Sequence, residues 1–360
     1  MAGFSIVGGV ALRNYATAAV YKKLVQGILH VNGKGVDESY VSGQLGNASI
    51  SIPRVALGDG AFRMLGATVN GAGFNSKEAV SASSDYIEVP LMYVYDRVET
   101  LPRILNDKAG YDLLNQKLEN IVRKIDRGIN ALTFAVQFAK VMNDAAVAGE
   151  EGMITSYDPA AEKALDAFIT ANTNLDNGDQ ELGVDYFPTE NRQAFLRPTF
   201  FASILKSDGK LILNSNLGQE MLATGYLNPF KNSEASKIEM RDGYCGELAG
   251  VPMYKVSPIV WTLAASYCNL GNNPAPATAF DNIEAVVCSS WGTIRGFTAA
   301  ESIEVVPAVA GQGWIMQPLV HGGCLCISGK SCQLVVNSNF ELPTSAETKF
   351  TILPPESRAA

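Results

Sequence analysis

Apolar residues recur at spacings of three and four through a long stretch in the first half of the chain. This pattern predicts one amphipathic helix over Tyr111–Ala148, about 55 Å long at 1.5 Å per residue. A compact domain seldom needs so long a helix, so we expect an elongated molecule. Phe134 and Phe138 broaden the apolar stripe and favour packing against a sheet over a coiled coil, and Gly128 predicts a bend. The periodic positions are Leu114, Leu118, Ile121, Val122, Ile125, Ile129, Leu132, Val136 and Ala139.

Two alternating segments upstream of this helix predict a pair of strands. Apolar and polar residues alternate over Ile50–Leu57 and over Tyr86–Tyr95, where Pro53 and Pro90 favour edge positions. The intervening segment, Gly58–Ser84, is rich in Gly, Ala and Ser. Such a long hairpin has little core of its own, so we expect it to dock on another molecule.

The rest of the chain predicts an α+β fold with mainly antiparallel strands, because no regular strand-helix-strand repeat is present. Asp158 as N-cap and Pro159 at the first helical position predict a second helix that ends near Ala171. Short helices and strands alternate as far as Pro258, and Leu263–Phe280 is expected to be rich in loops. The later strands are expected at Ile283–Ser289, Ile303–Val306, Ile315–Val320 and Cys324–Val336.

Charge is unevenly distributed along the chain. The whole chain carries a net charge of -8, which argues against a dedicated nucleic-acid binder. Residues 1–84 nevertheless hold seven Lys or Arg against four acids, net +3, which leaves -11 for the remaining 276 residues. A basic arm and an acidic body would allow the arm of one copy to lie on the body of the next. Only 18% of residues are charged, which indicates a surface partly covered by partners.

The search for catalytic and metal-binding motifs yields one weak candidate. Only His30 and His321 could serve as a histidine base, and no nucleophile elbow, zinc-protease helix or phosphate-binding loop is present. A possible metal cluster, His321, Cys324, Cys326 and Cys332, has the residue types of a zinc site but an irregular spacing. Because cysteine is so often buried as a small apolar residue, we favour structural burial and expect no bound metal or cofactor. The six cysteines, with no signal peptide before them, predict reduced thiols in a cytoplasm.

The most specific stretch of sequence lies between Asp185 and Ser257. Its phrases are Asp185-Tyr-Phe-Pro-Thr-Glu-Asn-Arg192, Phe195-Leu-Arg-Pro-Thr-Phe200, Gly243-Tyr-Cys-Gly246 and Leu248-Ala-Gly-Val-Pro-Met-Tyr-Lys-Val-Ser257. This order resembles the major capsid proteins of tailed bacteriophages with the Hong Kong 97-like fold, in which "P-x-x-x-R, then a strand ending in P" precedes "G-x-x-G-x-x-x-G-V-P-V-Y-x-S". Met253 replaces the commoner valine. Ile283-Glu-Ala-Val-Val-Cys288 and Gly292-Thr-Ile-Arg-Gly-Phe297 resemble the strands that follow in that family.

The resemblance implies an architecture of five consecutive parts. These are an N-terminal arm (1–49), an extended hairpin loop (50–98), a peripheral domain with a spine helix (99–183), an axial domain (184–300), and return strands of the peripheral domain with a C-terminal tail (301–360). It also implies that an axial loop, Ser266–Thr278, lines the symmetry axes. The expected contacts between subunits involve the hairpin residues Arg54, Phe62, Arg63, Met64, Leu65, Phe74 and Lys77.

The function implied by the resemblance is that of a structural protein, not an enzyme. Such a subunit would self-assemble as pentamers and hexamers into the virion shell around double-stranded DNA, in the cytoplasm of a bacterial host. Its other partners would be a portal, decoration proteins and a separate scaffolding protein, since no scaffolding segment is evident before the arm. The alternatives are an encapsulin-like nanocompartment shell and a metal-dependent hydrolase.

Overall fold

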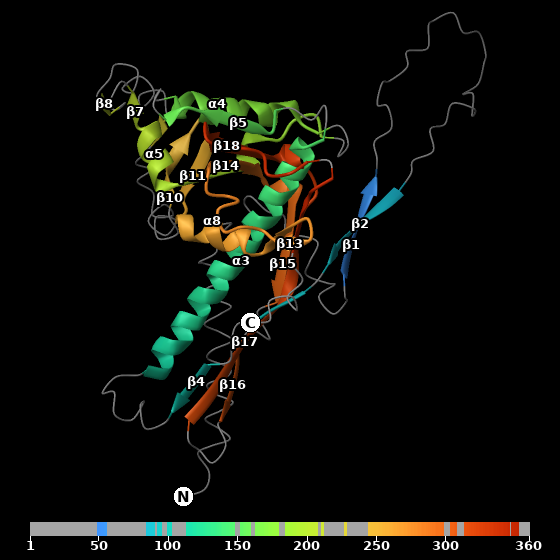
Figure 1. Ribbon diagram of the computed structural model, residues 1–360, viewed down its shortest axis with the longest axis vertical. Coiled ribbons are helices and arrows are strands. Elements are labelled where there is room, and N and C mark those ends of the chain that lie inside the picture. Colours follow the sequence, from blue (N-terminus) through green and yellow to red (C-terminus); the bar gives the residue numbers. More distant parts are fainter. Residues whose placement is uncertain are drawn as a thin grey trace, which may run out of the picture.

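The computed structural model describes residues 49–55, 84–90, 92–95, 99–102, 113–147, 152–159, 163–179, 184–207, 210–211, 227–228, 244–298, 303–307, 313–345 and 347–352. The predicted N-terminal arm and the tip of the predicted hairpin lie outside these residues. Within them the chain forms a rounded body from which a helix and a group of strands extend in one direction and a two-stranded hairpin extends in another (Figure 1).

The long helix predicted from the apolar period is present as α3, Leu113–Ala145. Its second half is buried on almost every side, and Phe134, Phe138 and Met142 are fully inaccessible to solvent. Its first half extends below the body, as Figure 1 shows. At Gly128, where the sequence predicts a bend, an added Cβ would lie 3.2 Å from the hydroxyl of Tyr267, so the glycine allows a close approach.

A seven-stranded mixed sheet forms the centre of the body. Its parallel pairs are β11 with β6 and β18 with β5, and its other pairs are antiparallel. In spatial order the strands are β5 (Ile154–Tyr157), β18 (Cys332–Asn337), β14 (Ile283–Ser289), β6 (Arg192–Leu196), β11 (Val251–Lys255), β10 (Tyr244–Leu248) and β9 (Leu227–Asn228).

Helices cover both faces of this sheet, which explains why most residues of its central strands are buried. On β14, Val286 and Cys288 join the core beneath α3 and α8 (Pro258–Ala265). Ala285 and Val287 point the other way, into the core beneath α4 (Ala164–Asn174) and α5 (Pro198–Ile204). Successive strand residues face opposite sides, so a strand between two helical layers has no polar side.

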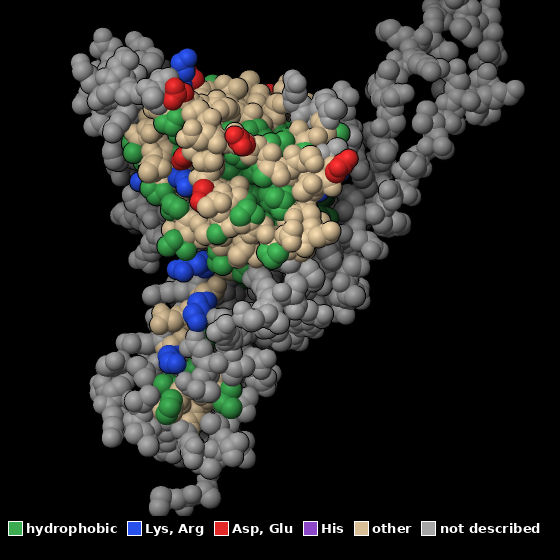
Figure 2. All heavy atoms as spheres, in the orientation of Figure 1, with side chains coloured by type: hydrophobic (Ala, Val, Ile, Leu, Met, Phe, Trp, Pro, Cys, Tyr) green, Lys and Arg blue, Asp and Glu red, His purple; other side chains and the backbone are tan. Residues whose placement is uncertain are grey.

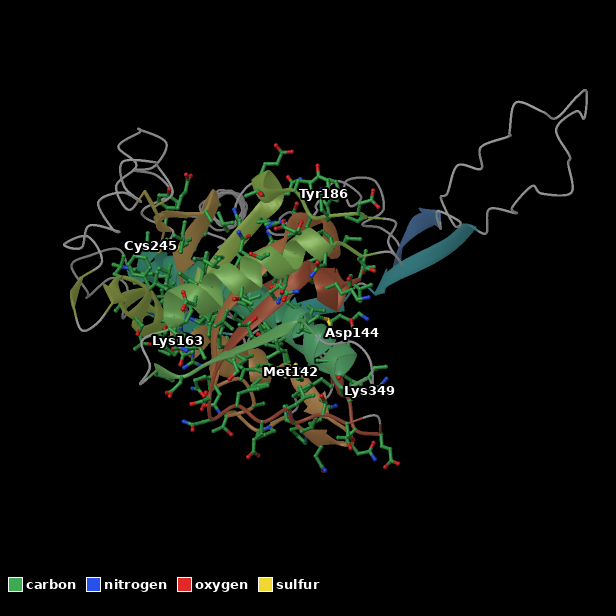
Figure 3. All side chains as sticks on the ribbon, turned by 90° about the horizontal axis from the view of Figure 1, so that it is seen from above. Met142, Asp144, Lys163, Tyr186, Cys245 and Lys349 are labelled. Atoms are coloured by element: carbon green, nitrogen blue, oxygen red, sulfur yellow. The ribbon has the colours of Figure 1, made fainter. Side chains whose placement is uncertain are left out.

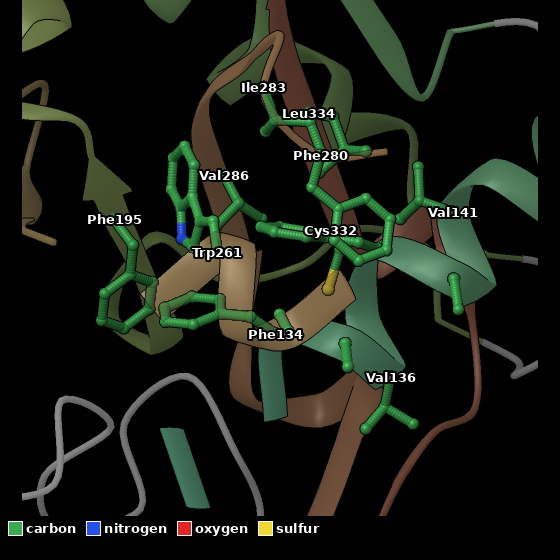
Figure 4. Close-up of a cluster of buried hydrophobic side chains, with 14 of the residues drawn as sticks. Phe134, Val136, Val141, Phe195, Trp261, Phe280, Ile283, Val286, Cys332 and Leu334 are labelled. Carbon is green, nitrogen blue, oxygen red and sulfur yellow. The ribbon is translucent and has the colours of Figure 1, made fainter. Parts of the chain in front are cut away.

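Aromatic rings fill the core between α3 and α8 (Figure 4). Trp261 lies edge-on to Phe138 and to Phe134, with ring centroids 5.6 and 6.3 Å apart. Phe134 meets Phe195 of β6 edge-on at 5.3 Å, and Phe138 meets Phe280 at 5.2 Å. These edge-to-face contacts fix the second half of α3 on the sheet.

The long strand β17, Gly313–Cys326, organises the strands that extend below the body. Its 14 residues span about 46 Å at 3.3 Å per residue. Its partners along this length are β15 (Thr293–Thr298), β16 (Ile303–Pro307), β3 (Met92–Tyr95) and β4 (Glu99–Pro102). This strand layer and the first half of α3 lie side by side in Figure 1, and α3 contacts β17.

Smaller elements complete the described structure. A three-stranded sheet joins β12 (Cys268–Leu270), β13 (Asn273–Pro274) and the C-terminal β19 (Phe350–Ile352). Asn143 of α3 holds β19 in place, because its side-chain amide hydrogen-bonds to both the N–H and the C=O of Phe350 at 2.8 Å. The remaining elements are β1 (Ser49–Val55), β2 (Ser84–Pro90), β7 (Lys206–Ser207), β8 (Lys210–Leu211) and the 3₁₀ turns η4 (Leu175–Asn177), η6 (Thr189–Asn191), η9 (Ser290–Gly292) and η11 (Gly329–Ser331).

One helix prediction and one loop prediction need correction. The helix predicted to begin at Asp158 begins at Ala164, with Lys163 as N-cap, and continues to Asn174. After β5 ends at Tyr157, Pro159 is in 3₁₀ conformation, so the predicted start is helical but not part of α4. The segment predicted to be loop-rich from Leu263 begins instead with the last residues of α8 and then contributes β12 and β13.

Three strand predictions also need correction. The strand expected over Tyr86–Tyr95 has two different partners: β2, which ends at Pro90, pairs with β1, whereas β3, which begins at Met92, pairs with β17. Pro90, the last residue of β2, has no N–H to donate to a ladder. The strand expected over Cys324–Val336 is also divided, because Ser328 caps a 3₁₀ turn by accepting a hydrogen bond from the N–H of Lys330 at 3.1 Å. By contrast, the separate strand expected over Ile315–Val320 is part of β17. This strand continues through Gly322, which is paired with both β15 and β3, and Gly323, which is paired with β15.

The seven-stranded sheet combines strands from three of the five segments predicted from the sequence. Strand β5 comes from the segment 99–183, β18 from 301–360, and the other five from 184–300. The segment boundaries therefore do not coincide with the edges of this sheet, and the division into domains stays a prediction. The same holds for the axial role of Ser266–Thr278, whose strand β12 pairs with β19.

Candidate assembly surfaces

The first candidate surface is the hairpin formed by β1 and β2. Seven residue pairs are in antiparallel register, from Ser49 opposite Pro90 to Val55 opposite Ser84. In Figure 1 this ribbon projects away from the body, and no described strand pairs with its outer edges. An isolated two-stranded ribbon is at best marginally stable in water, so this one needs additional contacts.

Of the residues predicted to contact other subunits, only Arg54 lies in the described part of the hairpin. Arg54 is directly opposite Asp85 in the backbone register of the hairpin. The other candidates in the tip, Phe62, Arg63, Met64, Leu65, Phe74 and Lys77, lie outside the described residues. Their role in contacts between subunits stays a proposal.

The arginine of the phrase Pro188-Thr-Glu-Asn-Arg192 is a buried structural link. Its side chain is 1% exposed and donates hydrogen bonds to the backbone carbonyls of Phe187 and Asn172, each at 2.8 Å. It also pairs with the carboxylate of Asp176. One guanidinium thus joins the end of α4, the loop before β6 and the first residue of β6.

Other residues of the same stretch mark turns. Pro198 is at the first turn of α5, where its missing N–H costs no helical hydrogen bond. The strands β10 and β11 are joined by a two-residue turn, Ala249–Gly250, with Leu248 opposite Val251. Both turn residues have positive φ, 53° and 76°, as a type I′ turn requires. These residues of the phrases therefore shape the body.

The cysteine candidates lie in the core beneath α3. Cys324, Cys326 and Cys332 are 5%, 3% and 0% exposed, and all three belong to the apolar cluster that includes Phe138 and Trp261. His321 is in β17, opposite Thr298 and Tyr93. Within the described ranges, no group of three or more His, Cys, Asp or Glu side chains is arranged to hold a metal ion.

Burial and hydrogen bonding raise the pKa values of several thiols in this chain. A hydrogen bond to the thiol of Cys332, together with burial, raises the pKa of Cys326 well above its ordinary value. The pKa of Cys332 is raised by a hydrogen bond to Cys288 and by burial. Burial raises the pKa of Cys245 to about 12. The raised pKa values keep these buried thiols in the neutral form, which fits an apolar packing role.

Two exposed aromatic side chains are surface features that the sequence patterns did not single out. Tyr186 is 59% exposed and Trp291 is 47% exposed. Tyr186 is part of the phrase that begins at Asp185, but nothing in the phrase indicates that Phe187 is buried and Tyr186 is not. Exposed large aromatic rings are enriched at protein interfaces, so both mark a candidate contact surface.

None of the helices in the described ranges is long and apolar enough to cross a membrane.

The arrangement of α3, the hairpin, the β17 strand layer and the two-sided sheet is the Hong Kong 97-like capsid fold, with the α+β class predicted from the sequence. Sequence comparison alone gives no match to a protein-family model or to a curated protein. Solved capsid structures match over most of the chain. The capsid of Ralstonia phage GP4 has a TM-score of 0.51 at 10% identity, covering 89% of this chain and 92% of that one.

Two further solved structures have TM-scores of 0.50. The mature capsid of bacteriophage PhiM1 is 12% identical and covers 86% of this chain and 87% of its own. The capsid of the cyanophage P-SCSP1u is 14% identical, with 82% and 84% covered. At these identities the likeness establishes the fold.

Proposed function

We propose that this chain is the major capsid protein of a tailed bacteriophage, which assembles through pentamers and hexamers into an icosahedral shell around double-stranded DNA. The observation that carries the proposal is the projecting β1–β2 hairpin on a Hong Kong 97-like body. A ribbon of two strands without a core of its own is explained when neighbouring copies supply its contacts.

A structural role accounts for the chemistry of the described residues better than catalysis does. The buried thiols of Cys326 and Cys332 are held neutral, and the buried arginine Arg192 is occupied by backbone carbonyls. The net charge of -8 suits a container that must hold DNA without binding it tightly. We propose a portal, decoration proteins and a separate scaffolding protein as further partners, with assembly in the cytoplasm of the bacterial host.

The hairpin provides the test. Because Val55 is opposite Ser84, replacing residues 56–83 with Asn-Gly closes the two strands with a two-residue turn and removes only the tip. We expect this variant to fold normally, because the body loses none of its described core, and to form no closed shells. Circular dichroism measures the fold and sedimentation velocity measures assembly.

A substitution far from the hairpin serves as the matched control. Lys163→Ala changes an exposed side chain that makes no capping hydrogen bond, and it should assemble like the wild type. Normal shells from the tip deletion would contradict the proposed role of the hairpin. So would an unfolded subunit, because the tip would then belong to the core.

A further inference from the structure

The first half of α3 carries positive charge along one exposed face. Lys124 and Arg127 are exposed and Lys117 is partly exposed. At 100° per residue these three positions lie within roughly 80° of one another around the helix. Figure 2 shows Lys and Arg side chains in a line along this part of the molecule, below the body. We call Lys117, Lys124 and Arg127 the basic face.

The sequence around the basic face has a positive balance in an acidic protein. Residues 113–128 hold four basic and two acidic residues, whereas the whole chain has a net charge of -8. The charged residues of this segment are Lys117, Glu119, Arg123, Lys124, Asp126 and Arg127. A local positive surface on an acidic subunit favours a partner surface that is itself acidic.

Such a surface is present on the body, at one end of the central sheet. Arg192 of β6 is opposite Ser289 of β14, so the turn before β6 and the turn after β14 lie at the same end. The first turn carries Glu190 and the second carries Trp291, both exposed.

Asp185 and Tyr186 adjoin these turns. The side chain of Arg192 is hydrogen-bonded to the carbonyl of Phe187, which anchors the loop carrying both residues beside the start of β6. Both side chains are exposed, and Figure 3 labels Tyr186 at the margin of the body. We call Asp185, Tyr186, Glu190 and Trp291 the acidic aromatic patch.

The two surfaces are chemically complementary. Carboxylates pair with ammonium and guanidinium groups, and the faces of Trp and Tyr rings attract the same cations. The chain already uses this contact internally, since the guanidinium of Arg197 lies 4.9 Å from the ring centroid of Trp261 and the ammonium of Lys255 lies 4.3 Å from that of Phe201.

The basic face and the patch cannot meet within one chain. The turn η9, which carries Trp291, contacts η11, and the N–H of Gly329 in η11 is bonded to the carboxylate of Asp144 at 3.0 Å. The patch is therefore near the C-terminal end of α3. Arg127 is 17 residues upstream of Asp144, about 25 Å along the helix, which exceeds the reach of a side chain. Only different copies can bring the two surfaces together.

We propose that the acidic aromatic patch of one subunit binds the basic face of the spine helix of the next. This inference rests on the proposed shell function and names one of its contacts. Two different surfaces in contact make a head-to-tail interface, which closes into rings when the rotation fits. A shell built from pentamers and hexamers needs an interface of this kind.

A charge-swap experiment tests the contact in the full-length protein. The variants are Lys124→Glu with Arg127→Glu on the basic face, Asp185→Lys with Glu190→Lys on the patch, and all four substitutions together. Each pair alone should raise the critical concentration for assembly about tenfold or more, because it places like charges opposite each other. The four substitutions together should restore it to within about threefold of the wild type. Light scattering over a dilution series measures this concentration.

The controls separate this contact from general charge effects. Lys163→Glu with Lys349→Glu changes the net charge by the same amount as the basic-face pair at exposed positions outside both surfaces, and it should leave assembly unchanged. Trp291→Ala should weaken assembly at all salt concentrations, whereas the charge reversals should lose part of their effect at high salt.

The possible outcomes separate a failure of the proposed contact from a failure of the proposed function. If the wild type forms no shells, the proposed function itself fails. If it does form shells, and the reversals have no effect or the four substitutions do not restore assembly, the contact is refuted alone. Basic-face variants that assemble normally but retain less DNA would show that this face binds nucleic acid instead of a second subunit.

Discussion

Replacing Arg192 with methionine removes the guanidinium that joins α4, the preceding loop and β6, while leaving a side chain of similar length. The substitution removes the donor to the backbone carbonyl of Phe187 at 2.8 Å and one of two hydrogen bonds to the carbonyl of Asn172, which also accepts from the N–H of Leu175. Each buried acceptor left without a donor costs about 1–3 kcal/mol. We therefore expect Arg192→Met to lower the free energy of unfolding by about 3–5 kcal/mol, the usual cost of breaking a buried charged network.

Two companion substitutions divide this loss into its parts. Arg192→Lys keeps the charge but cannot reproduce the planar set of donors, so we expect about 2–3 kcal/mol. Asp176→Asn removes only the ion pair, and because the Asp176 side chain is 58% exposed the loss should stay below about 1 kcal/mol. The order of the three losses follows from the backbone contacts being buried and the carboxylate being open to solvent.

Urea unfolding of the dissociated subunit, followed by tryptophan fluorescence, measures these losses. Trp261 is fully buried in the core, so its emission reports on the folded body. The reasoning would be refuted by an Arg192→Met variant within about 1 kcal/mol of the wild type, a difference small enough for a surface substitution. It would also be refuted if Asp176→Asn proved as costly as Arg192→Met.

Three further substitutions test local features of the fold by the same unfolding measurement. Gly178→Ala should lower the free energy of unfolding by more than about 2 kcal/mol, because φ is 63° and the new Cβ would overlap the carbonyl oxygen of Val184. Gly152→Ala, with φ of 101° and open space around it, should show only the smaller cost of the backbone conformation. Equal losses for the two variants would contradict this. Ala249→Asn should stabilise by about 0.5–1 kcal/mol, since Asn-Gly suits a type I′ turn better than Ala-Gly, and a loss would contradict the assigned turn. Burial raises the pKa of Glu284, so the folded state binds its proton more tightly than the unfolded state. Stability from this group therefore increases as pH falls from the raised pKa toward the ordinary value, and the stability of Glu284→Gln relative to wild type should decrease from pH 7 to pH 4; an increase would contradict the direction of the shift.

The sequence predicts most where one local pattern decides the structure. The three-and-four spacing located α3 to within three residues at each end, and the apolar run Ile283–Ser289 coincides with β14. The start of the next α-helix was predicted less well. Asp158 and Pro159 have the local features of a helix start, and Pro159 is in 3₁₀ conformation, but the described α-helix begins at Ala164.

The candidate surfaces show the same limit. Alternation was enough to indicate the two strands of the hairpin, but not that β3 turns away to pair with β17. The acidic aromatic patch depends on the register of β6 against β14, which brings Glu190 and Trp291 together from positions a hundred residues apart. Register between distant strands cannot be read from local composition.

Cryo-electron microscopy of the purified full-length protein tests the central claim most directly. The account predicts closed shells with fivefold and sixfold clusters of subunits, in which the β1–β2 hairpin of each subunit lies against a neighbour. A monodisperse monomer at every concentration examined, or shells in which the hairpin makes no contact with another subunit, would contradict it.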